Sequence, residues 1–186
     1  KNAVEKYEAV GRLLNDSGIE CEVYPQGSFR TGTVVRPLRG GKEQNYDIDL
    51  VCEVRGACTT DPRLTRERVL SALQKSDVYA DILDESDRCL TLNYADCGGV
   101  GFLLDVVPAR AQGASYIEDL IEQGVDRSYA EKAITLPERI SECNFRWLPS
   151  NPEGFALWFD RKNQRFKDAG LTERRKRYFE ANKDVY

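Results

Sequence analysis

Histidine and methionine are absent from the 186-residue sequence, and its six cysteines include no Cys-x-x-Cys pair. Structural zinc sites usually combine paired Cys, or Cys and His, at short spacing, so no zinc site is expected. Several cysteines fall inside apolar stretches, where reduced cysteine behaves as a small core residue. This usage is typical of a reducing compartment. We therefore expect a cytoplasmic protein with unpaired cysteines.

Long apolar runs are also absent, so no membrane span is expected, and the first residues carry no signal-peptide pattern. The net charge of -4 argues against a nucleic-acid binder that relies on bulk electrostatic attraction, although a local basic groove stays open. With 41% hydrophobic residues, the chain can bury a real core, as one domain or one domain plus part of another. Because it begins at Lys1 and lacks Met, we expect residues to precede it in the full protein.

Hydrophobic periodicity predicts an α+β fold with a mixed, largely antiparallel sheet flanked by helices. Helices are predicted over 2–16 and after Asp61-Pro62, which is an N-cap followed by proline in the first turn. Alternating patterns predict strands at 19–24, 47–54, 88–95 and 100–107. The last two are joined by a short loop at Gly98-Gly99, so they should pair antiparallel.

The rest of the chain is predicted to be mostly helical after position 108. A loop is expected at 36–45 and a helix at roughly 115–133, followed by another loop. Asn151-Pro152-Glu153 begins a helix that reaches about Gly170, and a last helical stretch covers 172–186. We therefore predict a core at 1–150 and, at 151–186, the start of a C-terminal helical domain. Trp147, Trp158, Phe159 and the cysteines are expected in the core.

Three carboxylates stand where a divalent metal could use them. Asp47 and Asp49 are two apart on a strand, so both side chains point to one face, where they repel each other unless a cation lies between them. Asp105 is a lone charge in the apolar strand 100–107, and a charge buried there needs a partner. Carboxylates suit Mg²⁺, which keeps coordination positions for substrate phosphates. If the two strands are adjacent, the three carboxylates could hold two Mg²⁺ ions.

A Gly-Ser turn precedes the first of these strands. In Gln26-Gly27-Ser28, glycine permits a backbone conformation that other residues resist, and the small side chains leave backbone N–H groups open to an anion. Alone, this is no more than a capped turn, and Asp47 with Asp49 alone reads as a solvated strand face. Joined with Asp105, the three features favour a metal and phosphate site.

Together these motifs resemble the DNA polymerase β-like nucleotidyltransferases. Within that superfamily, the segments 26–33, 47–51 and 103–109 are similar to the bacterial CD-NTases, the cyclic GMP-AMP synthase-like enzymes of anti-phage (CBASS) signalling. The aromatic segment 151–159 is similar to a stretch that follows the third Asp in these enzymes. The resemblance covers most of the first 160 residues and depends on the combination of motifs.

The resemblance implies a Mg²⁺-dependent enzyme, with Mn²⁺ as a substitute ion, that joins ribonucleoside triphosphates, ATP among them, into a cyclic di- or trinucleotide and releases pyrophosphate. Asp47 and Asp49 would bind both ions, and Asp105 would complete the catalytic metal site near the attacking 3′-hydroxyl. Gln26, Gly27 and Ser28 would contact the donor nucleotide. The resemblance also implies a regulatory protein partner and a separate effector, and the lack of a zinc motif argues against DNA sensing.

Two other functions stay open at this point. One is a template-independent tailing enzyme or a toxin-type nucleotidyltransferase that acts on RNA or protein. The other is a catalytically silent binding module with the same fold. Retention of all three Asp and the Gly-Ser turn favours an enzyme, because clustered carboxylates serve no purpose in a silent copy.

Overall fold

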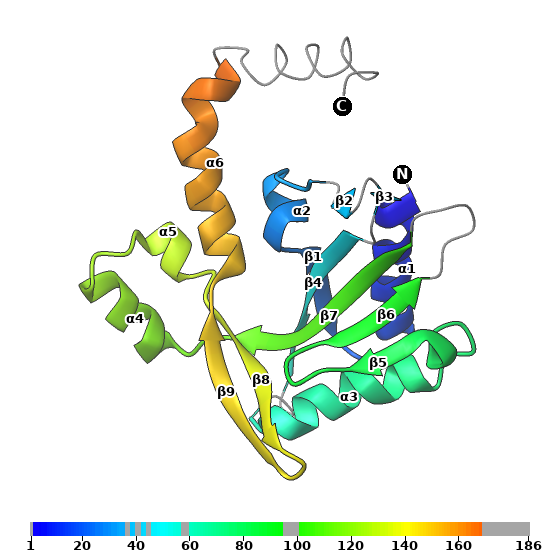
Figure 1. Cartoon of the computed structure of the whole chain (residues 1–186). Coiled ribbons are helices and arrows are strands. Elements are labelled where there is room, and N and C mark those ends of the chain that lie inside the picture. The colour runs from blue at the N-terminus through cyan, green and yellow to red at the C-terminus, as the bar shows by residue number, and fades with distance from the viewer. Residues whose placement is uncertain are drawn as a thin grey trace.

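The computed structural model describes residues 2–35, 38–39, 42–43, 46–56, 60–94 and 101–168. Its helices are α1 (Asn2–Asp16), α2 (Gly27–Thr31), α3 (Pro62–Gln74), η2 (Ala80–Ile82), α4 (Ala114–Glu122), α5 (Arg127–Ala130) and α6 (Pro152–Asp168). Its strands are β1 (Cys21–Pro25), β2 (Leu38–Arg39), β3 (Lys42–Glu43), β4 (Tyr46–Val54), β5 (Leu83–Glu85), β6 (Leu90–Tyr94), β7 (Phe102–Ala111), β8 (Ile134–Ser141) and β9 (Asn144–Ser150). Figure 1 shows their arrangement.

A mixed sheet forms the centre of the fold. Its strands run in the order β1-β4-β7-β6-β5, and β8 joins the far end of β7 and pairs with β9. Among the described residues, the β4–β7 pair is parallel and every other neighbouring pair of this sheet is antiparallel. This confirms the predicted α+β fold, and β6 pairs antiparallel with β7 as predicted.

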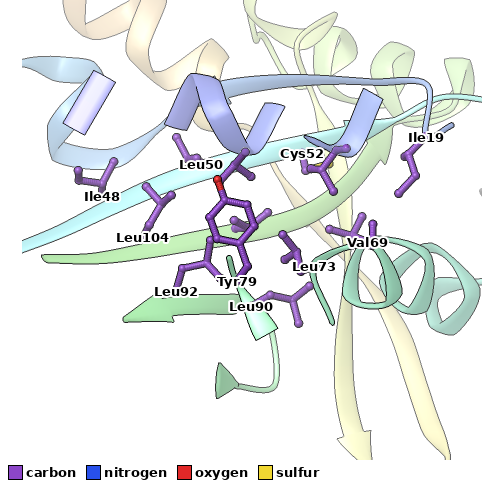
Figure 2. Packing of buried hydrophobic residues seen from close by; sticks show 14 of the residues in the cluster. Ile19, Ile48, Leu50, Cys52, Val69, Leu73, Tyr79, Leu90, Leu92 and Leu104 are labelled. Carbon is purple, nitrogen blue, oxygen red and sulfur yellow. The ribbon is translucent and has the colours of Figure 1, made fainter. Parts of the chain in front are cut away.

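Helices α1 and α3 cover one face of this sheet, and the main core lies between these helices and the sheet (Figures 1 and 2). Ile48 and Leu50 of β4, with Leu104 and Val106 of β7, are fully buried on this face. They pack with Val10 and Leu14 of α1 and Val69 and Leu73 of α3. Each such side chain contributes about 1.5–3 kcal/mol relative to an exposed one. Because side chains alternate along a strand, Asp47, Asp49 and Asp105 belong to the opposite face.

That opposite face has a smaller core of its own. Val51 of β4 and Val107 and Ala109 of β7 pack there against Ile134 and Leu136 of β8. The β8–β9 hairpin therefore covers the later part of these strands. The earlier part, which carries the carboxylates, is left to α2 and α6, which lie beside each other at that end of the sheet (Figure 1).

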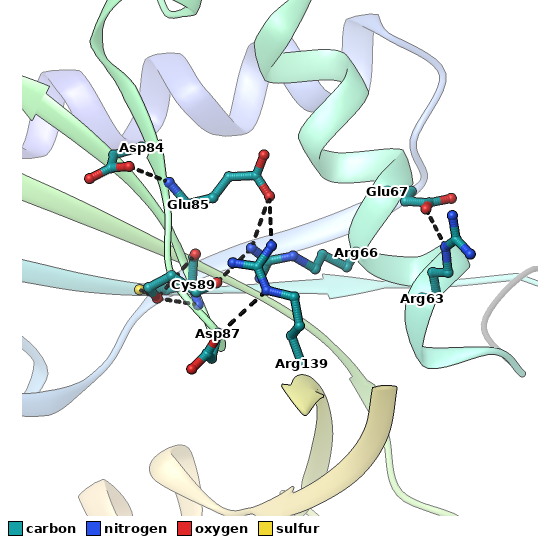
Figure 3. A network of polar contacts seen from close by, with 9 residues as sticks. Arg63, Arg66, Glu67, Asp84, Glu85, Asp87, Cys89 and Arg139 are labelled. Carbon is teal, nitrogen blue, oxygen red and sulfur yellow. Dashed lines mark hydrogen bonds and ion pairs between the residues drawn. The ribbon is translucent and has the colours of Figure 1, made fainter. Parts of the chain in front are cut away.

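Helix α3 is also held by a buried arginine (Figure 3). Arg66 is 1% exposed. Its guanidinium donates to the Ser86 carbonyl oxygen at 2.7 Å and to Glu85 at 3.3 Å. Arg139 of β8 pairs with the same Glu85 carboxylate and with Asp87. The network joins α3, the β5–β6 turn and β8, and it satisfies much of a charge that would be costly to bury alone.

Three predicted segments differ from the structure. The helix expected at 115–133 is two short helices, α4 and α5, because the chain reverses at Gly124 with a φ of +90°. The loop expected after it is the β8–β9 hairpin. In the loop expected at 36–45, β2 and β3 pair as a two-residue ladder. The N-cap prediction is confirmed, since Asp61 accepts hydrogen bonds from the backbone of Arg63 and Leu64.

Two of the residues expected in the core are exposed. The Trp158 side chain is 43% exposed on α6, and Cys143 lies at the exposed β8–β9 turn. Cys52 is buried as expected. The Gly98-Gly99 loop, Cys58, Cys97, part of the loop predicted at 36–45, the predicted end near Gly170 and the stretch 172–186 lie outside the described residues. Among the helices of the described ranges, none has both the length and the apolar character of a transmembrane span.

Candidate active site

The three carboxylates come together because β4 and β7 are parallel neighbours. In this pairing Asp47 lies opposite Leu103, and Asp49 lies opposite Asp105. All of these side chains project from the face opposite α1 and α3. The condition on which the predicted shared site depends, that the Asp105 strand lies beside the Asp47 strand, is therefore met. Asp47 is exposed at the start of the strand, while Asp49 and Asp105 are half-buried.

Asp49 sits at the electrostatic centre of this group. Burial, and then the negative charges of Asp105 and Asp47, raise the pKa of the Asp49 carboxyl above its usual range. Like charges held close together in a partly desolvated site disfavour one another's ionised forms. A cation bound among them would reverse this effect.

The Gly-Ser turn packs directly on Asp49. The Gln26 backbone N–H donates to the Asp49 carbonyl oxygen at 2.8 Å. Gly27 has a φ of +60°, and a Cβ added there would lie 2.7 Å from Asp49 Oδ2. Both the left-handed backbone and the close approach to the Asp49 carboxylate therefore favour glycine at this position. Ser28 follows on α2, where it is exposed.

Asp105 is oriented by a neighbour on the next strand. Thr91 of β6 lies opposite it in the antiparallel register, and the Thr91 hydroxyl donates to Asp105 Oδ1 at 2.6 Å. Thr91 Oγ1 is in turn 3.7 Å from the Cys89 sulfur. A short hydrogen bond of this kind restrains the rotation of the carboxylate.

A cavity of about 400 Å³ opens beside Asp49, between α2 and the start of α6. Of the six predicted site residues, Gln26, Gly27 and Asp49 line it, whereas Ser28, Asp47 and Asp105 lie outside its lining. The far wall consists of Ser150, Asn151, Pro152, Phe155 and Ala156. The site thus has a carboxylate and the glycine turn on one side and the first turn of α6 on the other.

The donor set fits a hard divalent cation. Three carboxylates from two adjacent strands provide oxygen ligands, and the raised pKa of Asp49 is what an unscreened cluster would produce. Within the described ranges, however, no three Cys, Asp or Glu side chains are arranged to enclose an ion. The pairing of β4 with β7 therefore brings the three Asp residues close together, but their carboxylates would have to rotate toward one another to bind the same ion.

Sequence reasoning missed three contributors to this site. Thr91 carries no signal of its own and becomes visible only when the β6–β7 register places it opposite Asp105. Phe155 and Asn151 were noted as part of a helix start, yet they line the cavity. The sequence feature that could have identified Phe155 and Asn151 is their position at the N-terminus of the aromatic helix that follows the third Asp in the chain.

Comparisons with known proteins found relatives in sequence and in structure. No protein-family profile matches the sequence. A c-di-GMP synthase from Roseivirga ehrenbergii is 31% identical over 159 residues, which cover 82% of this chain and 36% of that protein. The chain thus spans little more than a third of this relative.

Solved structures of the same kind share the fold. The CD-NTase CdnG of Bradyrhizobium diazoefficiens, solved in complex with GTP, superposes with a TM-score of 0.60 at 29% identity, over 84% of this chain and 40% of CdnG. The Vibrio cholerae cyclic AMP-GMP synthase DncV, in complex with a linear intermediate, gives 0.54 at 20% identity, over 80% of this chain and 38% of DncV. Over most of its length the chain is therefore similar to the bacterial CD-NTases, and it has their polymerase β-like nucleotidyltransferase fold.

Proposed function

We propose that this chain is the nucleotidyltransferase core of an enzyme that joins ribonucleoside triphosphates into a cyclic di- or trinucleotide second messenger. The observation that carries the proposal is the register of β4 and β7, which puts Asp49 opposite Asp105 with Gly27 packed on Asp49. A turn that can approach phosphates and a carboxylate cluster that can hold divalent ions are both needed for nucleotidyl transfer, and here they touch.

The reaction assigns each group a role. The 3′-hydroxyl oxygen of one nucleotide attacks the α-phosphorus of the other, the bond to the bridging oxygen breaks, and pyrophosphate leaves with that electron pair. In this proposal Asp105, whose Oδ1 accepts a hydrogen bond from Thr91, takes the hydroxyl proton on Oδ2. Gln26, Gly27 and Ser28 hold the triphosphate of the donor, and the 400 Å³ cavity beside them receives it.

Asp47, Asp49 and Asp105 would hold two Mg²⁺ ions, with Mn²⁺ as a substitute. When bound, such a pair stabilises the attacking and leaving oxygens of an in-line displacement. In this proposal Asp47 and Asp49 would bind both ions and Asp105 would complete the site, with Asp49 between the turn and Asp105.

Guanine nucleotides are proposed as substrates, with ATP as a further candidate. The support is the name of the Roseivirga relative and the GTP bound to CdnG. We also propose that 1–150 is the catalytic core and 151–186 leads into a second, helical domain. We further propose that the protein is cytoplasmic, and that it acts in anti-phage defence with a regulatory protein partner and a downstream effector.

Product analysis of the full-length protein tests the function. The protein is incubated with all four labelled ribonucleotides and Mg²⁺ or Mn²⁺, beside an Asp47→Asn, Asp49→Asn double variant, and phosphatase-resistant products are identified by mass. We expect a cyclic product that contains guanine and is lost in the variant. Linear products alone would favour a tailing enzyme. No product and no nucleotide binding would favour a silent module.

A further inference from the structure

Helix α2, which carries the Gly27 turn, is only five residues long and is held from three sides. At the N-terminus of α2, the Gln26 backbone N–H donates to the Asp49 carbonyl oxygen of β4. Its Phe29 ring meets the Tyr7 ring of α1 edge to face, with centroids 6.4 Å apart. The third tie is Arg30, which points away from the sheet to α6. So short a helix has little stability of its own, and these ties set its position.

Arg30 binds two carboxylates of α6 at once. Its Nε and Nη2 donate to the two oxygens of Glu153, each at 3.1 Å, and Nη1 donates to Asp160 Oδ2, also at 3.1 Å. Glu153 and Asp160 share a face of α6, because residues about two turns apart align along a helix. The three side chains are 25%, 26% and 35% exposed, so water screens these contacts only in part. A bidentate pair of this kind fixes orientation as well as distance.

The same two helices form the walls of the candidate nucleotide cavity. Gly27 and Thr31 belong to α2, while Phe155 and Ala156 belong to α6. The start of α6 is itself anchored: Asn151 accepts from the Gly154 backbone N–H at 2.9 Å and donates to the Tyr129 carbonyl oxygen at 2.8 Å. With one wall fixed in this way, the Arg30 contacts set how far the other wall stands from it.

We propose that Arg30 is a positioning residue that clamps the Gly27 turn to α6 and thereby sets the width of the nucleotide cavity. The inference rests on the proposed function, since it deepens the role of the same site. Loss of the guanidinium leaves Glu153 and Asp160 facing α2 without their shared cation. The turn then shifts relative to Asp49 and Phe155, and nucleotide binding weakens although no group that touches the nucleotide has changed.

Binding of a non-hydrolysable GTP analogue with Mg²⁺, measured by calorimetry on the full-length protein, tests the clamp. The variants are Arg30→Gln, Arg30→Lys and the double change Glu153→Gln, Asp160→Asn. Arg55→Gln is the matched control, because it removes an exposed ion pair with Glu22 and neither of these residues lines the nucleotide cavity. Melting temperatures identify any variant that fails to fold. If Arg30→Gln does not fold, Arg30→Lys, which keeps the positive charge, takes its place in the binding test.

We expect the dissociation constant to rise about tenfold in Arg30→Gln and in the double variant, within the usual range for coupled sites. Lysine cannot donate two parallel hydrogen bonds to Glu153 and a third to Asp160 as arginine does, so Arg30→Lys should also bind the nucleotide more weakly than wild type. If the double variant binds as well as wild type while Arg30→Gln does not, Arg30 contacts the nucleotide itself and the clamp is wrong. Variants indistinguishable from Arg55→Gln would also overturn it. If wild type binds no nucleotide, the proposed function fails first, and the clamp fails with it.

Discussion

Replacing Gly27 with alanine should damage the site far more than it damages the fold. An L-residue in the left-handed region costs about 1–2 kcal/mol. In a domain of this size, that lowers the melting temperature by about 2–8 °C. The added Cβ would also lie 2.7 Å from Asp49 Oδ2, so either the carboxylate or the turn has to move.

Gly18 provides the matched control for this change. Its φ is +75°, close to the +60° of Gly27, and a Cβ added at Gly18 meets nothing within 4 Å. Gly18→Ala therefore carries the same backbone strain without the contact to Asp49. The two variants should have similar melting temperatures in the metal-free protein, apart from any relaxation around Asp49.

Their activities should differ. Misplacing a catalytic group by about 1 Å can reduce the rate by about 100-fold. We expect Gly27→Ala to lose about that factor in the initial rate of product formation at saturating nucleotide, and Gly18→Ala to stay within about twofold of wild type. Equal activities in the two variants would refute the role assigned to the contact between Gly27 and Asp49.

The remaining predictions concern charge and capping. Because the pKa of Asp49 is raised in the folded metal-free protein, its ionised form costs stability at neutral pH. Asp49→Asn should raise the metal-free melting temperature, with a difference that shrinks in acid, and only wild type should gain stability from Mg²⁺. Asp61→Ala removes the N-cap of α3 and should cost about 1 kcal/mol in urea unfolding, with little effect on nucleotide binding. Arg146 and Arg88 lower the pKa of Glu138, so Glu138→Gln should be less stable than wild type at neutral pH and equal to it below the lowered pKa.

The strands that carry the carboxylates could be predicted because their pattern is strongly local. Ile48 and Leu50 alternate with Asp47 and Asp49, and this fixes both the strand and its two faces. The pairing of β4 with β7 could be expected only through Asp105, whose charge in an apolar strand needs a partner. Because two strands that are distant in sequence form this parallel pair, periodicity alone does not identify it.

The missed elements have equally physical causes. The β8–β9 hairpin contains Pro137 and Pro149, which weaken a strand pattern, and its turn at Glu142 and Cys143 lacks glycine. The helix predicted over 115–133 was divided by Gly124, whose left-handed backbone the apolar period does not reveal. Arg30 and Thr91 act through contacts across elements, and such contacts become visible only in three dimensions.

Crystals of the full-length protein grown with Mn²⁺ and a non-hydrolysable GTP analogue test most directly whether the carboxylates and the Gly27 turn form one metal and nucleotide site. Anomalous scattering locates the ions without reference to activity. We predict manganese peaks bounded by Asp47, Asp49 and Asp105, with the triphosphate against Gln26, Gly27 and Ser28. Ions bound elsewhere, or a nucleotide bound away from this turn, would contradict the proposed site.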